Sequence, residues 1–165
     1  MELTPECNLR CRHCYNWWDK EIKGTGRRDS YKKTFRLLEY LIKNTPVENI
    51  TFTGGEPTIS ERFTELVLHA RVKGKRVTVI TNGNGPPAVY RQLADLKVNM
   101  MEFSIHAPVP EIHDKITGTA GSWKKAVENM NLMLKEGINI TPVIVLSSLN
   151  YQYAKETVHF FFRSG

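Results

Sequence analysis

Three cysteines near the start of the chain are the residues best suited to chemistry. Cys7, Cys11 and Cys14 are spaced C-x3-C-x2-C, and the 165-residue sequence has no others. An odd number of thiols packed this tightly is a poor disulfide framework, so the spacing favours a metal or redox role. Three thiolates on one loop can bind three irons of a [4Fe–4S] cluster. The fourth iron then stays open to an exogenous chelating ligand, as catalytic metal sites keep one position open.

Zinc is the main alternative for the same three thiols. A Cys3His site needs one imidazole, but His13 adjoins Cys14 in the sequence, which makes joint tetrahedral ligation awkward. A distant ring, His106 or His113, could complete the site instead. Spacing alone leaves iron–sulfur, zinc and no metal open, and it favours iron–sulfur.

A second motif, Thr53-Gly54-Gly55-Glu56-Pro57, follows a β-rich run. Two glycines allow a ligand to approach the backbone closely, or they permit positive φ. The carboxylate of Glu56 could accept a hydrogen bond from a ligand amine or fix the loop, and Pro57 stiffens the exit. A binding loop and a tight turn both remain open for this motif.

The elements that must position these residues alternate between β-rich runs and helical patterns. Strands are expected at residues 2–4, 49–53, 76–81, 98–106 and 138–146. Helices are expected at 30–43, 62–73, around 89–96, from Ser122 as N-cap to Gly137, and at 151–163. Five βα units in sequence predict an α/β fold with a parallel sheet and right-handed crossovers. Periodicity does not decide between an open doubly wound sheet and a partial barrel.

Both folds place function at the carboxyl ends of the strands. The unusual residues cluster there. The cysteines, the Gly-Gly-Glu-Pro motif, Thr81-Asn82-Gly83, Ser104-Ile105-His106 and residues 147–150 each follow or end an expected strand. We therefore expect one site along this edge of the sheet.

Composition limits the classes of protein to which this chain can belong. The chain is 41% hydrophobic and 24% charged, typical of a single globular domain, here residues 1–165. No run of about 20 apolar residues predicts a membrane span and no signal peptide is visible, so we expect no membrane and a cytoplasmic location. The net charge of +6 is concentrated around Arg27, Arg28, Lys32, Lys33 and Arg36. These basic residues form either a solvated helix face or a patch that binds an acidic partner. Because no aromatic residues are interleaved with them, we expect no nucleic-acid partner.

The cysteine motif followed by Tyr15, together with Gly-Gly-Glu-Pro after the next strand, resembles the radical S-adenosylmethionine (radical SAM) superfamily. The wording of residues 3–11 is similar to its peptide-maturase and sulfatase-maturating branch. Residues 113–118 and 121–123 resemble that branch too.

The resemblance implies a radical SAM core, a (βα) partial barrel. Cys7, Cys11 and Cys14 would bind a [4Fe–4S] cluster whose open iron is chelated by S-adenosylmethionine (SAM). An electron donor of the flavodoxin or ferredoxin type would reduce the cluster. Reductive cleavage of SAM would yield a 5′-deoxyadenosyl radical that abstracts hydrogen from a peptide, protein or small-molecule substrate. No catalytic residue beyond the cluster is implied.

The same resemblance implies which residues surround SAM. They are Tyr15, Gly54, Gly55, Glu56, Pro57, Asn82, Ser104, His106, Thr117, Val145, Ser147 and Asn150. Thr117 stands where some members carry an arginine for the SAM carboxylate. Simpler roles remain open: Ser104 can satisfy a strand end, His106 can be structural, and Asn150 can be the N-cap of the last helix. Replacing Gly55 by valine is expected to weaken SAM binding and leave the cluster intact.

A full core of this family has six βα units, and this chain supplies five. We expect it to be a fragment or truncated form, or a minimal variant that pairs with another chain. No cysteine follows Cys14, so this sequence cannot bind auxiliary clusters. Alternatives to a hydrogen-abstracting enzyme are a non-catalytic radical SAM-like binding module and an activase that installs a glycyl radical on a partner.

Overall fold

The structure is a computed structural model that describes residues 1–15 and 31–164. Arg27 and Arg28 of the expected basic patch lie outside the described residues. One sheet of four parallel strands forms the centre: β1 (Asn49–Phe52), β2 (Arg76–Thr81), β3 (Met100–Ser104) and β4 (Ile140–Val143). The spatial order β1-β2-β3-β4 repeats the sequence order.

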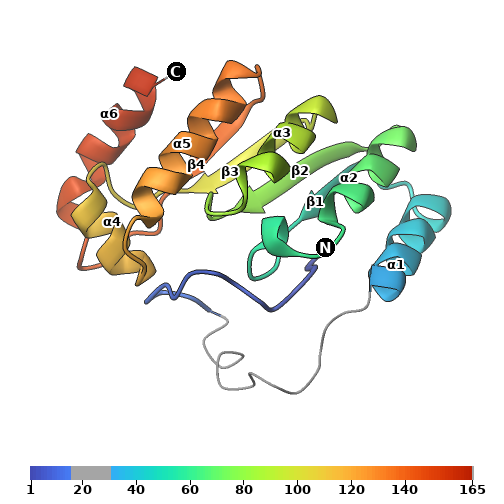
Figure 1. The fold of residues 1–165 in the computed structure, drawn as a ribbon, viewed down its shortest axis with the longest axis horizontal. Coiled ribbons are helices and arrows are strands. Elements are labelled where there is room, and N and C mark those ends of the chain that lie inside the picture. Colours follow the sequence, from blue (N-terminus) through green and yellow to red (C-terminus); the bar gives the residue numbers. More distant parts are fainter. Residues whose placement is uncertain (16–30, 165) are drawn as a thin grey trace.

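That order decides the topology that periodicity left open. A doubly wound sheet reverses direction at a switch point, whereas here every crossover steps to the next strand. Right-handed crossovers in one direction place the helices on one side. Accordingly α2 (Phe63–Val72), α3 (Pro87–Asp95) and α5 (Ser122–Lys135) form one layer over the sheet (Figure 1). The fold is an α/β partial barrel.

The core lies between the sheet and this helix layer. Successive strand residues point to opposite faces, and β3 follows that rule: Met101 and Phe103 are fully buried, while Glu102 and Ser104 are partly exposed. Burying a side chain of the size of Phe103 contributes roughly 1.5–3 kcal/mol. Ser104 therefore lies on the face of β3 that points away from the packed core.

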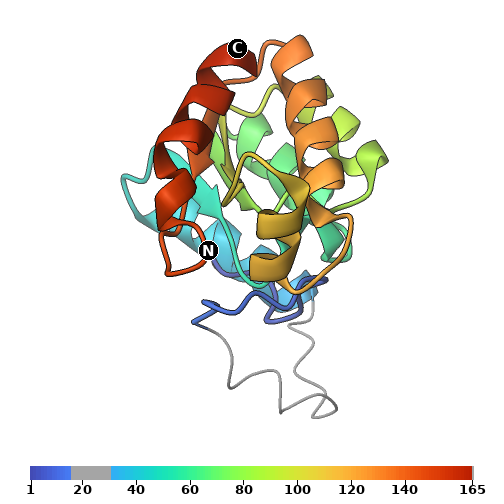
Figure 2. The same ribbon diagram turned by 90° about the vertical axis from the view of Figure 1, so that its left-hand side faces the viewer.

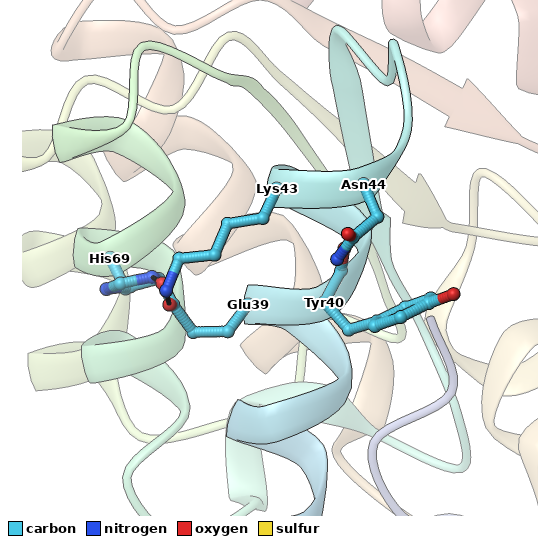
Figure 3. A network of polar contacts seen from close by, with 5 residues as sticks. All are labelled: Glu39, Tyr40, Lys43, Asn44 and His69. Atoms are coloured by element: carbon cyan, nitrogen blue, oxygen red, sulfur yellow. Dashed lines mark hydrogen bonds and ion pairs between the residues drawn. The ribbon is translucent and has the colours of Figure 1, made fainter.

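Helix α1 (Tyr31–Asn44) is attached to α2 by a polar contact. Figure 3 shows the Glu39 carboxylate of α1 reaching the ring of His69 on α2, beside Lys43 of its own helix. The Lys43 ammonium lies 2.5 Å from the carboxylate and, with His69, lowers the pKa of Glu39. At the end of α1, the Asn44 side chain donates to the Tyr40 carbonyl at 2.8 Å.

The last third of the chain adds helices at the β4 edge. These are α4 (Pro110–Thr117), which crosses near the strand ends, and α6 (Ala154–Ser164), which lies beside α5 (Figure 2). The rings of Trp123 and Phe160 join α5 to α6 at 5.8 Å between centroids. Two short 3-10 turns, η2 (Pro57–Ile59) and η3 (Tyr151–Tyr153), complete the described elements. Within residues 1–15 and 31–164, no helix is long and apolar enough to cross a membrane.

Three expectations need correction. Residues 2–4 form only a single parallel bridge from Glu2 to Thr53, because Pro5 has no N–H with which to extend a ladder. The strands expected at 98–106 and 138–146 are shorter, since their ends turn away as loops. Helix α4 was not expected, although Pro110 at its start and Gly118 after its end are typical of helix boundaries.

Candidate functional site

The cysteine loop crosses the carboxyl edge of the sheet. In Figure 1 the N-terminal segment, drawn in blue, runs along this edge from β1 to α4. Its first attachment is to the residues after β1. Leu3 N–H donates to the Thr53 carbonyl at 2.9 Å, and Gly55 N–H donates to the Thr4 carbonyl at 2.6 Å. Glu56 N–H then donates to the Glu6 carbonyl at 2.9 Å. The backbone immediately before Cys7 is thereby fixed against the Gly-Gly-Glu-Pro segment.

This attachment leaves no room for a side chain at Gly54 or Gly55. A Cβ on Gly55 would lie 2.1 Å from the Glu6 carbonyl oxygen, and one on Gly54 would lie 2.6 Å from the Thr4 oxygen. Gly54 also has φ of 144°, which side chains rarely adopt. The close approach is made by the cysteine loop itself. A side chain at Gly55 would therefore collide with the cysteine loop itself, so the effect of a Gly55 substitution on the cluster stays a prediction.

The Glu56 side chain fixes the loop from inside. It is fully buried, and its Oε1 accepts from the backbone N–H of Thr58 at 3.1 Å and contacts the hydroxyls of Thr58 and Thr81 at 2.5 and 2.7 Å. Its Oε2 accepts from Asn82 N–H at 2.6 Å. Burial raises the pKa of Glu56, and these donors oppose the shift. Of the two roles open for this carboxylate, the structure shows loop fixation, and Pro57 begins η2 directly after it.

The second attachment comes from the end of β2. The Asn82 side-chain amide donates to Asn8 Oδ1 at 2.9 Å and to Cys7 Sγ at 3.5 Å. Asn8 in turn donates to the Asn84 carbonyl at 2.9 Å. Residues 75 positions apart in the chain thus meet at one thiol.

The third attachment is α4. Arg10 N–H donates to the Thr117 carbonyl and Arg12 N–H to the Ile116 carbonyl, both at 2.9 Å. Carbonyls at a helix C-terminus have no partner within the helix, so the cysteine loop satisfies two of them. Gly118 follows with φ of 65°, and a Cβ there would meet the Arg10 carbonyl oxygen at 2.7 Å.

Asp114 orders the turn that presents those carbonyls. Its carboxylate accepts from Gly121 N–H at 2.6 Å, Trp123 N–H at 2.8 Å and the Ser122 hydroxyl at 2.9 Å. Ser122 is therefore the first residue of α5 rather than its N-cap, which is Gly121. Asp114 does the capping from the preceding helix, a role that no local sequence pattern indicated. The fully buried Thr117 hydroxyl bonds that of Ser122 at 2.6 Å, so its expected contact with SAM stays a prediction.

Three histidines lie where the loop meets β3 and α4. The rings of His13 and His106 are 4.6 Å apart, edge to face, and His106 stacks on His113 at 5.6 Å. His113 Nδ1 accepts from His106 N–H at 3.1 Å, and His106 Nδ1 accepts from Val145 N–H at 3.3 Å. Burial lowers the pKa of His106 to about 3 and that of His113 to about 4. Both rings are therefore neutral near pH 7, and His106 has a structural role whatever else it contacts.

The loop after β4 is folded around Asn150. Its Oδ1 accepts from Ser147 N–H at 2.7 Å and the Ser147 hydroxyl at 3.0 Å. Its side-chain amide donates to the His106 carbonyl at 2.8 Å and the Val145 carbonyl at 2.9 Å. Asn150 precedes η3 but makes no side-chain cap hydrogen bond, so capping is not its role. This buried side chain joins the β4 loop to the end of β3.

Two remaining residues lie at the margins. Tyr15 is exposed, and its hydroxyl lies 3.4 Å from a Glu2 carboxylate oxygen, which returns the end of the cysteine loop to its start. Ser104 ends β3 on the face away from the packed core. The structure thus brings the cysteines, Asn82, His106 and Thr117 to one edge of the sheet, and Ser104 lies at the end of β3 on the partly exposed face.

Comparison with known proteins shows which family this chain belongs to. The model of the radical SAM superfamily matches residues 1–161, nearly the whole chain. The chain belongs to the radical SAM superfamily. Mycofactocin maturase MftC of Mycobacterium tuberculosis is 32% identical over 87% of this chain and 36% of its own length. AlbA of Bacillus subtilis, an antilisterial bacteriocin subtilosin biosynthesis protein, is 29% identical over 84% of this chain and 30% of its own length.

Solved radical SAM structures share the fold. Streptococcus suis SuiB superposes with a TM-score of 0.81 at 18% identity, covering 99% of this chain and 36% of that protein. The anSMEcpe structure with bound AdoMet and a peptide gives 0.77 at 19% identity, covering 98% of this chain and 46% of that protein. The chain thus spans less than half the length of each of these four proteins. The superfamily consists of enzymes, and the relatives of this chain include maturases and synthases.

The residues present fit the cofactors that a radical SAM core implies. The three cysteines lie on one loop, and none of them forms a disulfide. Partial burial raises the pKa of Cys7, and the charges of Glu56 and Cys14 act on it in the same direction. Within residues 1–15 and 31–164, no three His, Cys, Asp or Glu side chains already converge as a metal site. The donor set fits a cluster, and the thiols have to converge when one binds.

Proposed function

We propose that this chain is a radical SAM catalytic core that binds a [4Fe–4S] cluster through Cys7, Cys11 and Cys14, and SAM beside it. The carrying observation is the attachment of the loop with the three cysteines to the residues that follow β1 and β2 and to α4. When bound, the two cofactors supply one-electron cleavage of SAM, which generates the radical that takes hydrogen from the substrate.

The residues of this chain have the task of placing the cofactors and excluding water. Gly54 and Gly55 hold the loop close, and Glu56 locks the turn behind it. Asn82, Ser104, His106, Thr117, Val145, Ser147 and Asn150 flank the proposed SAM site, together with Tyr15 and Pro57. His106, Thr117 and Asn150 support it by fixing the backbone, because their polar atoms already bond the protein. We also propose that residues 1–165 form one domain and act in the cytoplasm.

The proposed substrate is a peptide or protein. Support comes from SuiB, which was solved with its precursor peptide SuiA, and from relatives named as a mycofactocin maturase and a bacteriocin biosynthesis protein. A porphyrin or haem precursor is the second class, because an Fe-coproporphyrin III synthase of Methanosarcina barkeri is 29% identical over 84% of this chain. An electron donor of the flavodoxin or ferredoxin type completes the proposal, since the cluster must be reduced before each cleavage.

Electron paramagnetic resonance tests the proposal. The chain is reconstituted anaerobically with iron and sulfide, reduced with dithionite, and measured with and without SAM. We expect a reduced [4Fe–4S] signal that changes on adding SAM, and 5′-deoxyadenosine among the products. A cluster signal indifferent to SAM would contradict the SAM site in this chain, and retention of zinc without iron would contradict the cluster.

A further inference from the structure

The contact between Asn82 and Cys7 has a consequence for the proposed cluster. Cys7 Sγ receives two N–H groups: the Asn82 side-chain amide at 3.5 Å and the backbone N–H of Leu9 at 3.4 Å. Sulfur acceptors form longer hydrogen bonds than oxygen, so both distances are in range. The Leu9 donor belongs to the loop itself, whereas the Asn82 donor is brought in from β2.

Hydrogen bonds to two neighbouring residues fix the orientation of the Asn82 side-chain amide. Its Oδ1 accepts from Asn84 N–H at 2.8 Å, and its amide nitrogen donates to Asn8 Oδ1 at 2.9 Å. A flipped amide would place NH₂ against the Asn84 N–H and oxygen against the Asn8 oxygen, so only one orientation satisfies both neighbours. Its backbone is held by Glu56 and by the Asn84 side chain. The donor is therefore preorganised toward Cys7.

An N–H donor at a ligating sulfur has a defined electrostatic effect. Reduction adds negative charge to a cluster and to its sulfurs, and a donor stabilises that charge more in the reduced state. Removing the donor therefore makes the reduction potential more negative. The buried Glu56 carboxylate, whose charge also acts on Cys7, works in the opposite direction.

We propose that Asn82 is a positioning residue that donates a hydrogen bond to the cluster-ligating sulfur of Cys7 and thereby raises the reduction potential of the cluster. This rests on the proposed function, because it requires a cluster at Cys7. In this proposal the side-chain amide of Asn82 donates to the sulfur of Cys7, while its backbone N–H donates to the Glu56 carboxylate.

The test is a redox titration of the reconstituted chain without SAM, followed by electron paramagnetic resonance. Asn82→Leu removes the donor and adds no charge. Asn82→Asp keeps the size and the acceptor for Asn84 but cannot donate. The matched control is Asn129→Leu, because Asn129 holds the same turn through the carbonyls of Gly83 and Gly85 and has no contact with Cys7.

We expect Asn82→Leu to lower the reduced-to-oxidised ratio at a fixed potential about tenfold, equal to about 59 mV for one electron. Asn82→Asp is expected to lower it further, and Asn129→Leu to leave it unchanged. Equal potentials for wild type and both Asn82 variants would overturn the inference while leaving the proposed function intact. Absence of a cluster from the wild type would instead refute the proposed function.

If neither Asn82 variant assembles a cluster, the hydrogen bond is tested in the wild-type protein instead. Pulsed resonance on protein labelled with asparagine that carries ¹⁵N only in the side-chain amide should then detect a nitrogen coupled to the reduced cluster, because the other nearby amide, that of Asn8, donates to the Asn84 carbonyl. A spectrum without that coupling would refute the hydrogen bond.

Discussion

The carboxylate of Glu56, after β1, accepts a 2.6 Å hydrogen bond from the backbone N–H of Asn82, after β2. The same carboxylate binds Thr58 and Thr81. Through this one buried group, the turn that holds the cysteine loop is joined to the residue that donates to Cys7. The ends of two neighbouring strands therefore act as a single support for the loop.

Replacing Glu56 should loosen the segments that follow β1 and β2 at the same time. Glu56→Ala leaves several buried donors without an acceptor, so we expect the free energy of unfolding to fall by about 3 kcal/mol. Chemical denaturation measures this. Glu61→Ala, at an exposed position five residues later, is the control and should stay within about 0.5 kcal/mol of the wild type. Equal stability of the two variants would show that Glu56 does not lock the turn.

Adding one methyl group at Gly55 should displace the cysteine loop. The Cβ of Gly55→Ala would lie 2.1 Å from the Glu6 oxygen, so the backbone before Cys7 must move. We expect a strong loss of iron and acid-labile sulfide after reconstitution. Gly137→Ala is the control: its Cβ meets open space, and its φ of 73° costs roughly 1–2 kcal/mol of stability without touching the loop. Full iron loading of Gly55→Ala would contradict this packing.

Removing the central thiol should prevent cluster assembly. Cys11→Ala leaves two cysteines, which bind a four-iron cube poorly. Iron and sulfide analysis together with the visible absorption spectrum gives the readout. A brown, iron-loaded Cys11→Ala protein would count strongly against the ligand assignment.

Acid should destabilise the fold through His113. Burial lowers its pKa from the ordinary 6.5 to about 4, so the unfolded chain binds a proton that the folded one does not. Stability from this group is complete above pH 6.5 and falls as the pH drops from 6.5 to about 4, by roughly 3 kcal/mol. Its Nδ1 accepts from His106 N–H, a bond that His113→Asn can keep without titrating. The slope of unfolding free energy against pH should flatten in this variant, and an unchanged slope would refute the assignment.

The contact of Glu39 with His69 should decide how firmly α1 is attached. Glu39→Leu removes the contact between the helices, whereas Lys43→Leu removes only a contact within α1. We expect hydrogen exchange in α1 to become a few-fold faster in the first variant and to change less in the second. The reverse order would mean that the polar contact does not attach the helix.

The sequence by itself was enough to predict most of the helices and strands and the family. Hydrophobic periodicity placed β2 at residues 76–81 as observed, and α2 within one residue at each end, because burial of one face of an element is a local pattern. The spacing of Cys7, Cys11 and Cys14 with the Gly-Gly-Glu-Pro motif was enough to predict the family that the comparison confirmed.

Only the tertiary structure decided what the other site residues do. Gly55, Glu56 and Asn150 are suited to ligand binding and to internal bonding alike, and the choice depends on partners far away in the sequence. Gly55 N–H donates to the Thr4 carbonyl, the Glu56 carboxylate accepts from Asn82 N–H, and the Asn150 amide donates to the His106 carbonyl. Asp114 was missed for the same reason, since its partners lie in the next helix. A hydrogen bond forms between groups that the fold brings within about 3 Å, and local patterns carry no record of that distance.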